Sequence, residues 1–166
     1  MDLGGYFDVA HSEKNPIYWS FSGPDSWRMS VEKVSSAFVA DPELVSELEK
    51  YAKPVVVGAD HVLFRQGDAP RGVYILRKGL ARLTSQCDGD AILAVQAGAG
   101  SLLGVPAVVG GKPYSLTAEA MEGAELSLLP SDDFVRLMNT EPAIAFRVLQ
   151  VLAEEVRFAR EAIAHL

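Results

Sequence analysis

The stretch LFRQGDAPRGVYILRKG, residues 63–79, joins a glycine-rich turn to a run of consecutive apolar residues. Gly67, Gly72 and Gly79 permit tight turns, since glycine adopts backbone conformations that other residues avoid. Residues 73–76 are four apolar residues in a row, which suits a buried strand. The stretch therefore predicts β-structure with a sharp turn before a central strand.

Similar β-rich runs follow one another after Pro54, broken by Gly or Asp about every ten residues. This texture is typical of a sandwich or barrel. Strands are predicted at residues 55–57, 61–64, 73–77, 80–86, 91–97, 114–120 and 124–130.

Short helices are predicted on both sides of this β-region. The apolar spacing in residues 29–38 predicts the first helix. Asp41 followed by Pro42 predicts the start of a second, which ends at Pro54, because Asp caps free amides and Pro is tolerated at the first helical position. After the strands, residues 131–139 predict a third short helix.

The last helix, predicted over residues 142–166, carries two apolar stripes and therefore needs two partners. We expect one stripe to pack on the β-domain and the other on the same helix of a second subunit, which gives a homodimer; the alternative is burial of both within one subunit. The stripe predicted for the domain is Ile144, Val148, Val151 and Phe158, and the heptad seam predicted for the dimer is Leu149, Leu152, Val156, Ala159, Ile163 and Leu166.

Residues 1–29 are rich in aromatic side chains among Gly, Ser and Pro, which predicts an extended N-terminal arm. Its rings either cover apolar surface of the same domain or embrace a partner subunit. The predicted organisation is thus an arm at 1–29, a β-barrel domain with flanking short helices at 30–141, and a dimerisation helix at 142–166.

Composition excludes several function classes. The chain of 166 residues has a net charge of -7, which opposes attraction to nucleic acid and to anionic membranes. A single cysteine forms neither an internal disulfide nor a multi-thiolate metal site. No apolar run approaches the ~18 residues that span a bilayer, and the N-terminus lacks the features of a signal peptide, so we expect a cytoplasmic protein without direct contact to nucleic acid or membrane.

Motifs for catalysis are also missing from the sequence. The glycine-rich segment at 98–104 is one residue too long for a dinucleotide fingerprint, and Pro113 stands where a P-loop needs Ser or Thr. The three histidines are isolated, and Asp132 and Asp133 match helix-capping charges. We therefore predict no enzyme activity, no catalytic residues and no metal.

The stretch GAGSLLGVPAVVGGKPYSLTAEA, residues 98–120, places glycines, a proline and small apolar residues between two predicted strands. This composition is typical of a loop that cradles a ligand in a β-domain. No charged side chain occurs between Gly98 and Lys112, although a phosphate pocket usually has a fixed cation.

Residues 63–79 and 98–120 together resemble the cyclic-nucleotide-binding domain of the catabolite-activator and FNR (Crp/Fnr) class of bacterial regulators. The first matches that family's Gly-Asp, small-residue turn, apolar strand and closing Gly, and the second has the spacing of its phosphate-binding cassette. The resemblance covers about residues 45–166 and implies a mainly β jelly-roll (double-stranded β-helix) barrel with flanking N-terminal helices and a long C-terminal helix. It implies ligand contacts at Leu103, Gly104, Val105, Pro106, Ala107, Tyr114, Ser115 and Thr117.

Two residues depart from the family's cassette. Val105 stands in place of the Glu that holds the ribose hydroxyl, and Tyr114 in place of the Arg that pairs with the cyclic phosphate. Lys112 and the backbone amides near residues 101–104 are the remaining groups that could favour an anion. The resemblance therefore leaves a cyclic nucleotide possible but disfavoured, and it implies no other cofactor.

We expect a non-catalytic ligand-sensing regulatory domain that does not bind cyclic AMP tightly. Two alternatives stay open: a structural or protein-interaction module with a closed pocket, and a cyclic-nucleotide-binding effector domain of a transcriptional regulator without its DNA-binding domain. A cupin-type enzyme would need a metal-ligating histidine cluster, which the sequence lacks.

Overall fold

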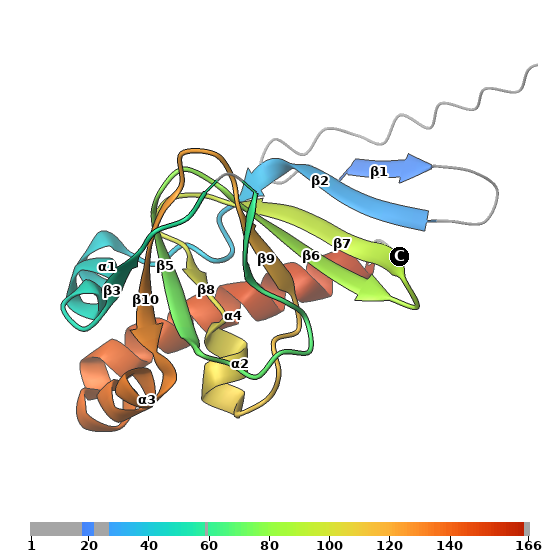
Figure 1. Ribbon diagram of the computed structural model, residues 1–166. Coiled ribbons are helices and arrows are strands. Elements are labelled where there is room, and N and C mark those ends of the chain that lie inside the picture. Colours follow the sequence, from blue (N-terminus) through green and yellow to red (C-terminus); the bar gives the residue numbers. More distant parts are fainter. Residues whose placement is uncertain (1–17, 22–26, 59, 165–166) are drawn as a thin grey trace, which may run out of the picture.

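The structure is a computed structural model that describes residues 18–21, 27–58 and 60–164. Its strands form a six-stranded sheet in the order β1-β2-β7-β6-β9-β4 and a four-stranded sheet in the order β3-β10-β5-β8 (Figure 1). The strands are β1 Tyr18–Phe21, β2 Trp27–Ser35, β3 Lys53–Val55, β4 His61–Phe64, β5 Gly72–Lys78, β6 Ala81–Cys87, β7 Asp90–Ala97, β8 Leu102–Leu103, β9 Thr117–Ala120 and β10 Glu125–Pro130. The two sheets make the predicted jelly-roll β-sandwich.

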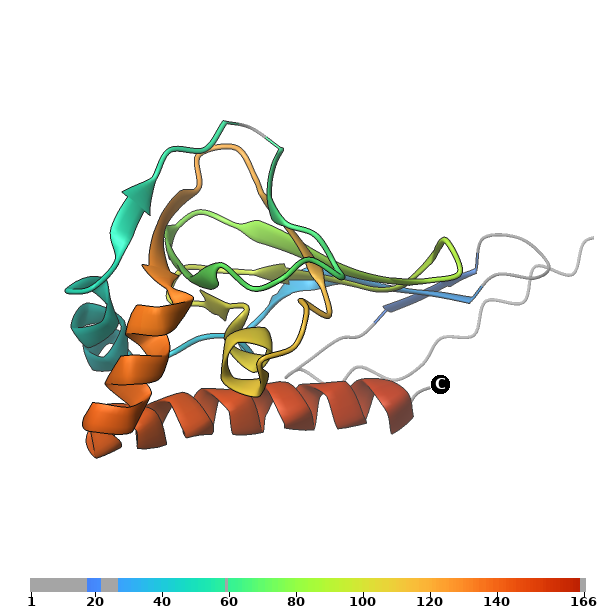
Figure 2. The ribbon, with the colours of Figure 1, turned by 60° about the horizontal axis from the view of Figure 1, so that its bottom comes forward.

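The helices are α1 Pro42–Glu49, α2 Val105–Gly110, α3 Ser131–Thr140 and α4 Pro142–Ala164. Helix α1 begins as predicted, because the Asp41 carboxylate accepts the amide of Leu44 at 2.9 Å. It ends at Glu49, and Pro54 lies in β3 instead of ending the helix. Helix α4 crosses the molecule beneath the sandwich, next to α2 (Figure 2).

The helix predicted over residues 29–38 is wrong, because Trp27–Ser35 form strand β2. Of the two helices predicted before the β-region, the described residues therefore form only α1. Strand β2 pairs with β7 in parallel, with Ser30 opposite Ala94. The sequence WRMSVE alternates apolar and polar residues with the period of two that a strand requires, and this signal competes with the helical spacing.

Part of the predicted arm also lies in this sheet. Strand β1 pairs antiparallel with β2, with Tyr18 opposite Ser30. The other residues of the arm, 1–17 and 22–26, lie outside the described part of the chain. Whether the arm reaches a partner subunit therefore stays a prediction.

The core has two clusters of buried side chains. One lies between the two sheets and contains Phe38, Phe64 and Tyr114. The other lies between the four-stranded sheet and the helices, and Phe134 of α3 is fully buried within it. Burying such a side chain contributes about 1.5–3 kcal/mol, so the helices are held to the sandwich mainly by apolar contact.

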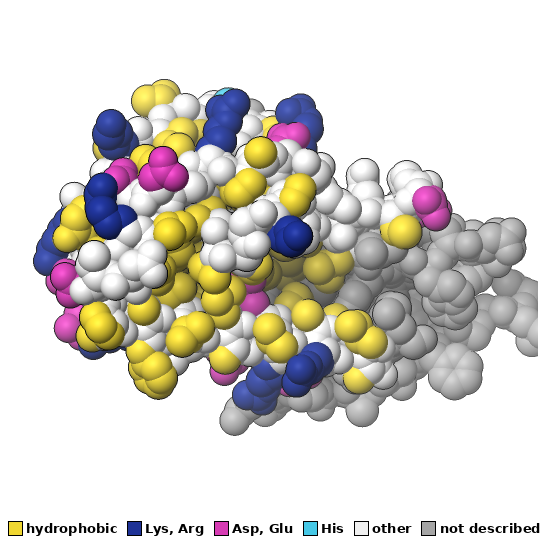
Figure 3. All heavy atoms as spheres, turned by 90° about the horizontal axis from the view of Figure 1, so that it is seen from below, with side chains coloured by type: hydrophobic (Ala, Val, Ile, Leu, Met, Phe, Trp, Pro, Cys, Tyr) yellow, Lys and Arg dark blue, Asp and Glu magenta, His cyan; other side chains and the backbone are white. Residues whose placement is uncertain are grey.

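Helix α4 has one buried and one exposed apolar face. Val148, Val151 and Phe158 are buried, and the Phe158 ring meets the Phe38 ring edge-on with centroids 6.1 Å apart. The seam predicted for the dimer lies mostly outward, and Figure 3 shows hydrophobic side chains along this side of the molecule. Leu149 is 57%, Val156 49% and Ile163 65% exposed, Ala159 is exposed, Leu152 is half-buried, and Leu166 lies outside the described residues.

Candidate functional site

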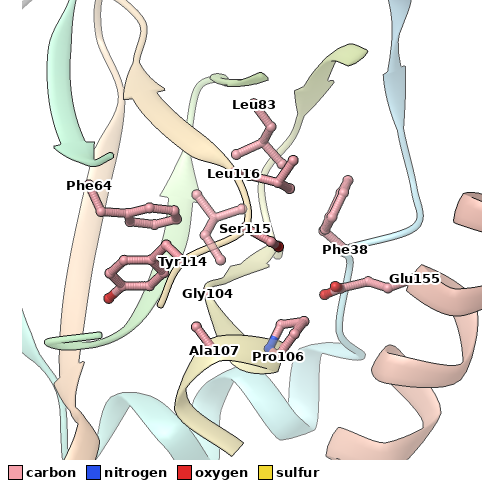
Figure 4. A pocket seen from close by; sticks show the side chains of 11 residues that line it. Phe38, Phe64, Leu83, Gly104, Pro106, Ala107, Tyr114, Ser115, Leu116 and Glu155 are labelled. Atoms are coloured by element: carbon pink, nitrogen blue, oxygen red, sulfur yellow. The ribbon is translucent and has the colours of Figure 1, made fainter. Parts of the chain in front are cut away.

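A cavity of about 40 Å³ lies between the sandwich, α2 and α4 (Figure 4). Pro106 and Ser115 are exposed and lie at its rim, whereas most of the other lining side chains are apolar or aromatic. The lining residues are Phe38, Phe64, Leu83, Leu103, Gly104, Pro106, Ala107, Tyr114, Ser115, Leu116 and Glu155.

Tyr114 closes one side of this cavity and is held at every polar atom. Its hydroxyl donates to the carbonyl of Gly72 at 2.8 Å and accepts the amides of Arg71 at 3.1 Å and Gly72 at 3.3 Å. Its own amide donates to the carbonyl of Asp68, and its carbonyl accepts the amide of Gly67. Burial raises the pKa of the Tyr114 hydroxyl, so this residue is a neutral group fixed to the turn before β5.

These backbone bonds explain why β9 begins at Thr117 and not at residue 114 as predicted. The amide and carbonyl of Tyr114 are already bonded to the turn at residues 67–68, so they are not available to the sheet. The segment before β9 therefore belongs to the cavity wall.

Gly104 makes room for Tyr114. Its φ is +91°, a left-handed conformation that side chains rarely adopt, and a Cβ there would lie 2.7 Å from Cε1 of Tyr114. Glycine is needed at this position both for the turn into α2 and for the close approach of the ring.

Glu155 projects from α4 toward the cavity (Figure 4). Its Oε1 atom is buried and has no hydrogen-bond donor among the described residues. Burial raises the pKa of this carboxyl from 4.5 to about 8, because the charged form loses its contact with water. The cavity therefore holds an acidic group that is largely protonated at neutral pH.

The structure brings most of the predicted ligand contacts together. Leu103, Gly104, Pro106, Ala107, Tyr114 and Ser115 all line the cavity, and their role as ligand contacts stays a prediction. Lys112 is exposed and is not among the lining residues.

Val105 and Thr117 do not line the cavity. Val105 is fully buried in the cluster between α2, α3 and β5, where it accompanies Val73 and Phe134. The Thr117 hydroxyl accepts the amide of Gln66 at 3.0 Å and so supports the turn after β4.

Several lining residues were not predicted from the sequence. Phe64 belongs to the stretch at residues 63–79, but its packing on Tyr114 depends on a fold that joins segments far apart in the chain. Glu155 lies at the edge of the buried stripe of α4, where an acidic residue is unusual and could have been recognised. The further unpredicted residues are Phe38, Leu83 and Leu116.

A second hollow, of about 180 Å³, lies beyond Phe64 and Tyr114, and these two side chains line both spaces. Its wall includes the exposed residues Arg65 and Arg71 together with Asp68. The two stacked rings thus form a partition between an inner acidic cavity and an outer hollow with two arginines.

Within the described ranges, no three His, Cys, Asp or Glu side chains are grouped so that they could hold a metal ion. The helices described here include none whose length and apolar character would let it cross a bilayer.

Residues 54–141 match the family model described as cyclic nucleotide-binding domain. Among curated proteins, the chain is similar to lysophospholipase nte1 of Aspergillus fumigatus, with 26% identity over 117 residues. That match covers 70% of this chain and 8% of the lysophospholipase. The chain thus spans a small part of the curated relatives that it matches.

Among solved structures, the chain is similar to the catabolite activator protein of Thermus thermophilus, with a TM-score of 0.65 and 26% identity over 78% of this chain and 62% of that one. It also shares the fold of the sensor domain of the transcriptional regulator DNR from Pseudomonas aeruginosa. There the TM-score is 0.57 and the identity 18%, over 73% of this chain and 82% of the sensor domain.

Proposed function

The chain belongs to the cyclic nucleotide-binding domain family, and we propose that it is a non-catalytic sensor in which a small ligand in the inner cavity changes the packing of α4. The observation that carries this proposal is the composition of the cavity wall. Glu155 from α4 faces Gly104 and Ala107 from the α2 region across one shared space. A ligand there contacts both the sandwich and the helix.

For the domain to act as a switch, its ligand must favour one packing of α4 over another. Glu155 supplies the differential contact, because its side chain leaves the cavity if the helix moves away. The helix is long, extends over Pro142–Ala164, and carries the exposed seam at its outer face. A small change at the cavity is therefore passed to the surface that we propose to be the dimer interface.

We propose that this surface joins two copies of the chain. The seam of Leu149, Val156 and Ile163 is apolar and exposed. Contact of such an apolar surface with water is unfavourable, and a partner that covers it would remove this cost. Its heptad spacing fits the same helix of a second copy. The proposed assembly is a two-fold homodimer through α4.

Tight binding of cyclic AMP is not part of this proposal. The position of the phosphate-binding Arg is taken by Tyr114, and no Lys or Arg is found among the residues that line the inner cavity. A charge-assisted hydrogen bond contributes about 1.5–3 kcal/mol, and an unpaired buried phosphate adds a desolvation cost. The cavity is also far smaller than the 300–1,000 Å³ typical of pockets for drug-sized ligands.

A protein-interaction module with a closed pocket is the second candidate. It is favoured by the bonds of Tyr114, which fix this side chain across the cavity on the side of the turn. In that case the exposed face of α4 alone would carry the function.

A sensor function differs from the reaction for which the longer relatives are named. The cavity lining contains one carboxyl and one serine but no histidine that could serve as a base. We therefore propose that a lysophospholipase reaction is not carried by this domain.

Calorimetry with cyclic AMP and cyclic GMP tests the nucleotide, and a thermal-shift screen of small metabolites tests the sensor. We expect dissociation constants above about 100 μM for both nucleotides, and at least one metabolite that raises the melting temperature. Ala107→Leu, which fills the cavity, should abolish that rise, whereas Ala153→Leu on the exposed side of α4 should keep it. Micromolar binding of cyclic AMP would contradict the proposal, and a complete lack of stabilising ligands would favour the closed module.

A further inference from the structure

The inner cavity places the half-buried side chain of Glu155 among aromatic residues. Oε1 of Glu155 has no donor in the described part of the protein, and the rings of Phe38, Phe64 and Tyr114 line the same space. A buried polar atom without a hydrogen bond is rare in folded proteins, since it loses its contacts with water and gains none. A ligand that supplies a hydrogen-bond donor or a positive charge would satisfy this atom.

We propose that the inner cavity binds a small organic ammonium ion through the carboxylate of Glu155 and the aromatic side chain of Phe38, which lies on the same side of the cavity (Figure 4). The inference rests on the sensor function proposed above and names the chemical class of its ligand. Carboxylates pair with ammonium groups by charge-assisted hydrogen bonds, and aromatic faces attract cations through the negative potential of their rings.

The charges around the cavity favour a cation over an anion. Glu155 is the one acidic or basic side chain among the described lining residues, which include no Lys, Arg or His. Electrostatic attraction is strong in this partly buried setting, because little water screens it. The same setting disfavours the phosphate of a nucleotide, so the cavity has a charge preference opposite to that of a phosphate site.

The size of the cavity limits the ligand to a few non-hydrogen atoms. An apolar cavity of about 150 Å³ accepts benzene, and the space here is about 40 Å³. Ser115 and Pro106 at the exposed rim provide access from solvent. Methylammonium and dimethylammonium fit these limits, and a ligand with so few atoms should bind in the millimolar range.

Binding of the cation should release a proton. Burial raises the pKa of Glu155 to about 8, so the free carboxyl is largely protonated at neutral pH, whereas a bound ammonium ion favours the carboxylate. Tyr114 is the other titratable group among the described lining residues, and its raised pKa keeps it neutral in this range. Affinity should therefore fall as the pH drops below 8, by a factor that approaches about tenfold for each pH unit.

A nuclear magnetic resonance titration of the isotope-labelled full chain tests the site directly. Methylammonium chloride is added up to about 100 mM at pH 8, with sodium chloride at equal ionic strength as reference. We expect saturable shifts of the amides of Gly104 and Ser115, at least about tenfold weaker binding at pH 6, and a similar loss in Glu155→Gln. Glu154→Gln, an exposed neighbour on α4, is the matched control and should bind as the wild type does.

The outcomes separate this inference from the sensor function. Shifts no larger than those caused by sodium chloride, or equal affinity in Glu155→Gln, would overturn the ammonium site. If a metabolite still stabilises the wild type in that case, the sensor proposal stands. Saturable binding without any change at the distant residues 142–148 of α4 would support the site and overturn the coupling to the helix.

Discussion

The ring of Tyr114 lies almost parallel to the ring of Phe64, with centroids 3.9 Å apart and planes inclined by 15°. Because Tyr114 is also bonded to the turn before β5, this stack connects that turn to strand β4 and to the cavity wall. The pair of rings determines how far the inner cavity extends. The stability of the turn and the extent of the cavity therefore depend on the same two side chains.

Tyr114→Phe should destabilise the protein by about 1–3 kcal/mol, because the carbonyl of Gly72 and the amides of Arg71 and Gly72 lose their partner in a buried place. Chemical denaturation measures this free energy. Tyr74→Phe is the matched control, since that hydroxyl donates one bond, to the carbonyl of Leu63 at 3.2 Å, and should cost about 1 kcal/mol or less. Equal effects would mean that the hydroxyl of Tyr114 does not hold the turn.

Gly104→Ala should cost more than Gly111→Ala. Both glycines have positive φ, so each substitution carries a backbone penalty of about 1–2 kcal/mol, but nothing lies within 4 Å of a Cβ at Gly111. At Gly104 the new methyl group meets the ring of Tyr114, which should add at least about 1 kcal/mol.

Thermal or chemical unfolding of both variants provides the comparison. Combining Gly104→Ala with Tyr114→Ala should remove the steric part of the penalty, and the double-mutant cycle measures this coupling. A cycle that shows no coupling would contradict the close approach of ring and glycine.

Glu155→Gln should change how stability depends on pH. The pKa of this carboxyl is higher in the folded protein, at about 8, than its ordinary value of 4.5, so the folded state holds the proton more tightly. Its contribution is complete below pH 4.5 and is lost as pH rises through about 8, with a slope of up to about 1.4 kcal/mol per unit in that window.

At pH 8 the Gln variant should therefore be more stable than the wild type, by about 1–3 kcal/mol, and this difference should shrink toward pH 5. Denaturation curves at several pH values measure it, with the exposed Glu154→Gln as control. A constant difference across the pH range would show that Glu155 does not titrate abnormally.

Val156→Asp combined with Ile163→Asp should convert the proposed dimer to a monomer of 17.9 kDa, because both side chains lie exposed on the seam of α4. Light scattering measures the mass. Glu154→Ala, on the same helix but outside the seam, should leave the mass unchanged. A double variant that is still dimeric would exclude this seam as the interface.

The fold could be predicted because its signals are local. The glycines and the apolar run of residues 63–79 specify a turn and a central strand, and Asp41 specifies the start of α1. The parallel strand β2 could not be predicted, since its partner β7 lies about sixty residues further along the chain. The residues of β2 also have an apolar spacing that fits a helix. The local sequence pattern does not distinguish the helix from the strand at these residues.

The site could be predicted in part for the same reason. The position of Gly104 and Tyr114 on the cavity wall follows from the spacing of the cassette, whereas the direction of Val105 depends on how α2 packs against Phe134. Glu155 reaches the cavity because α4 crosses beneath the sandwich (Figure 2). Such contacts between distant segments are properties of the tertiary structure alone.

The hairpin of β1 and β2 has a consequence for the behaviour of shortened chains. Strand β7 lies between β6 and β2, and Ser35 is the last residue that pairs with it from the N-terminal side. A chain that begins after Ser35 would leave this eight-residue strand with free amides and carbonyls along one edge. With the hairpin in place the edge of the sheet is β1, which has four residues. Long free edges recruit strands from other molecules, so the shortened chain should aggregate more readily than the full chain.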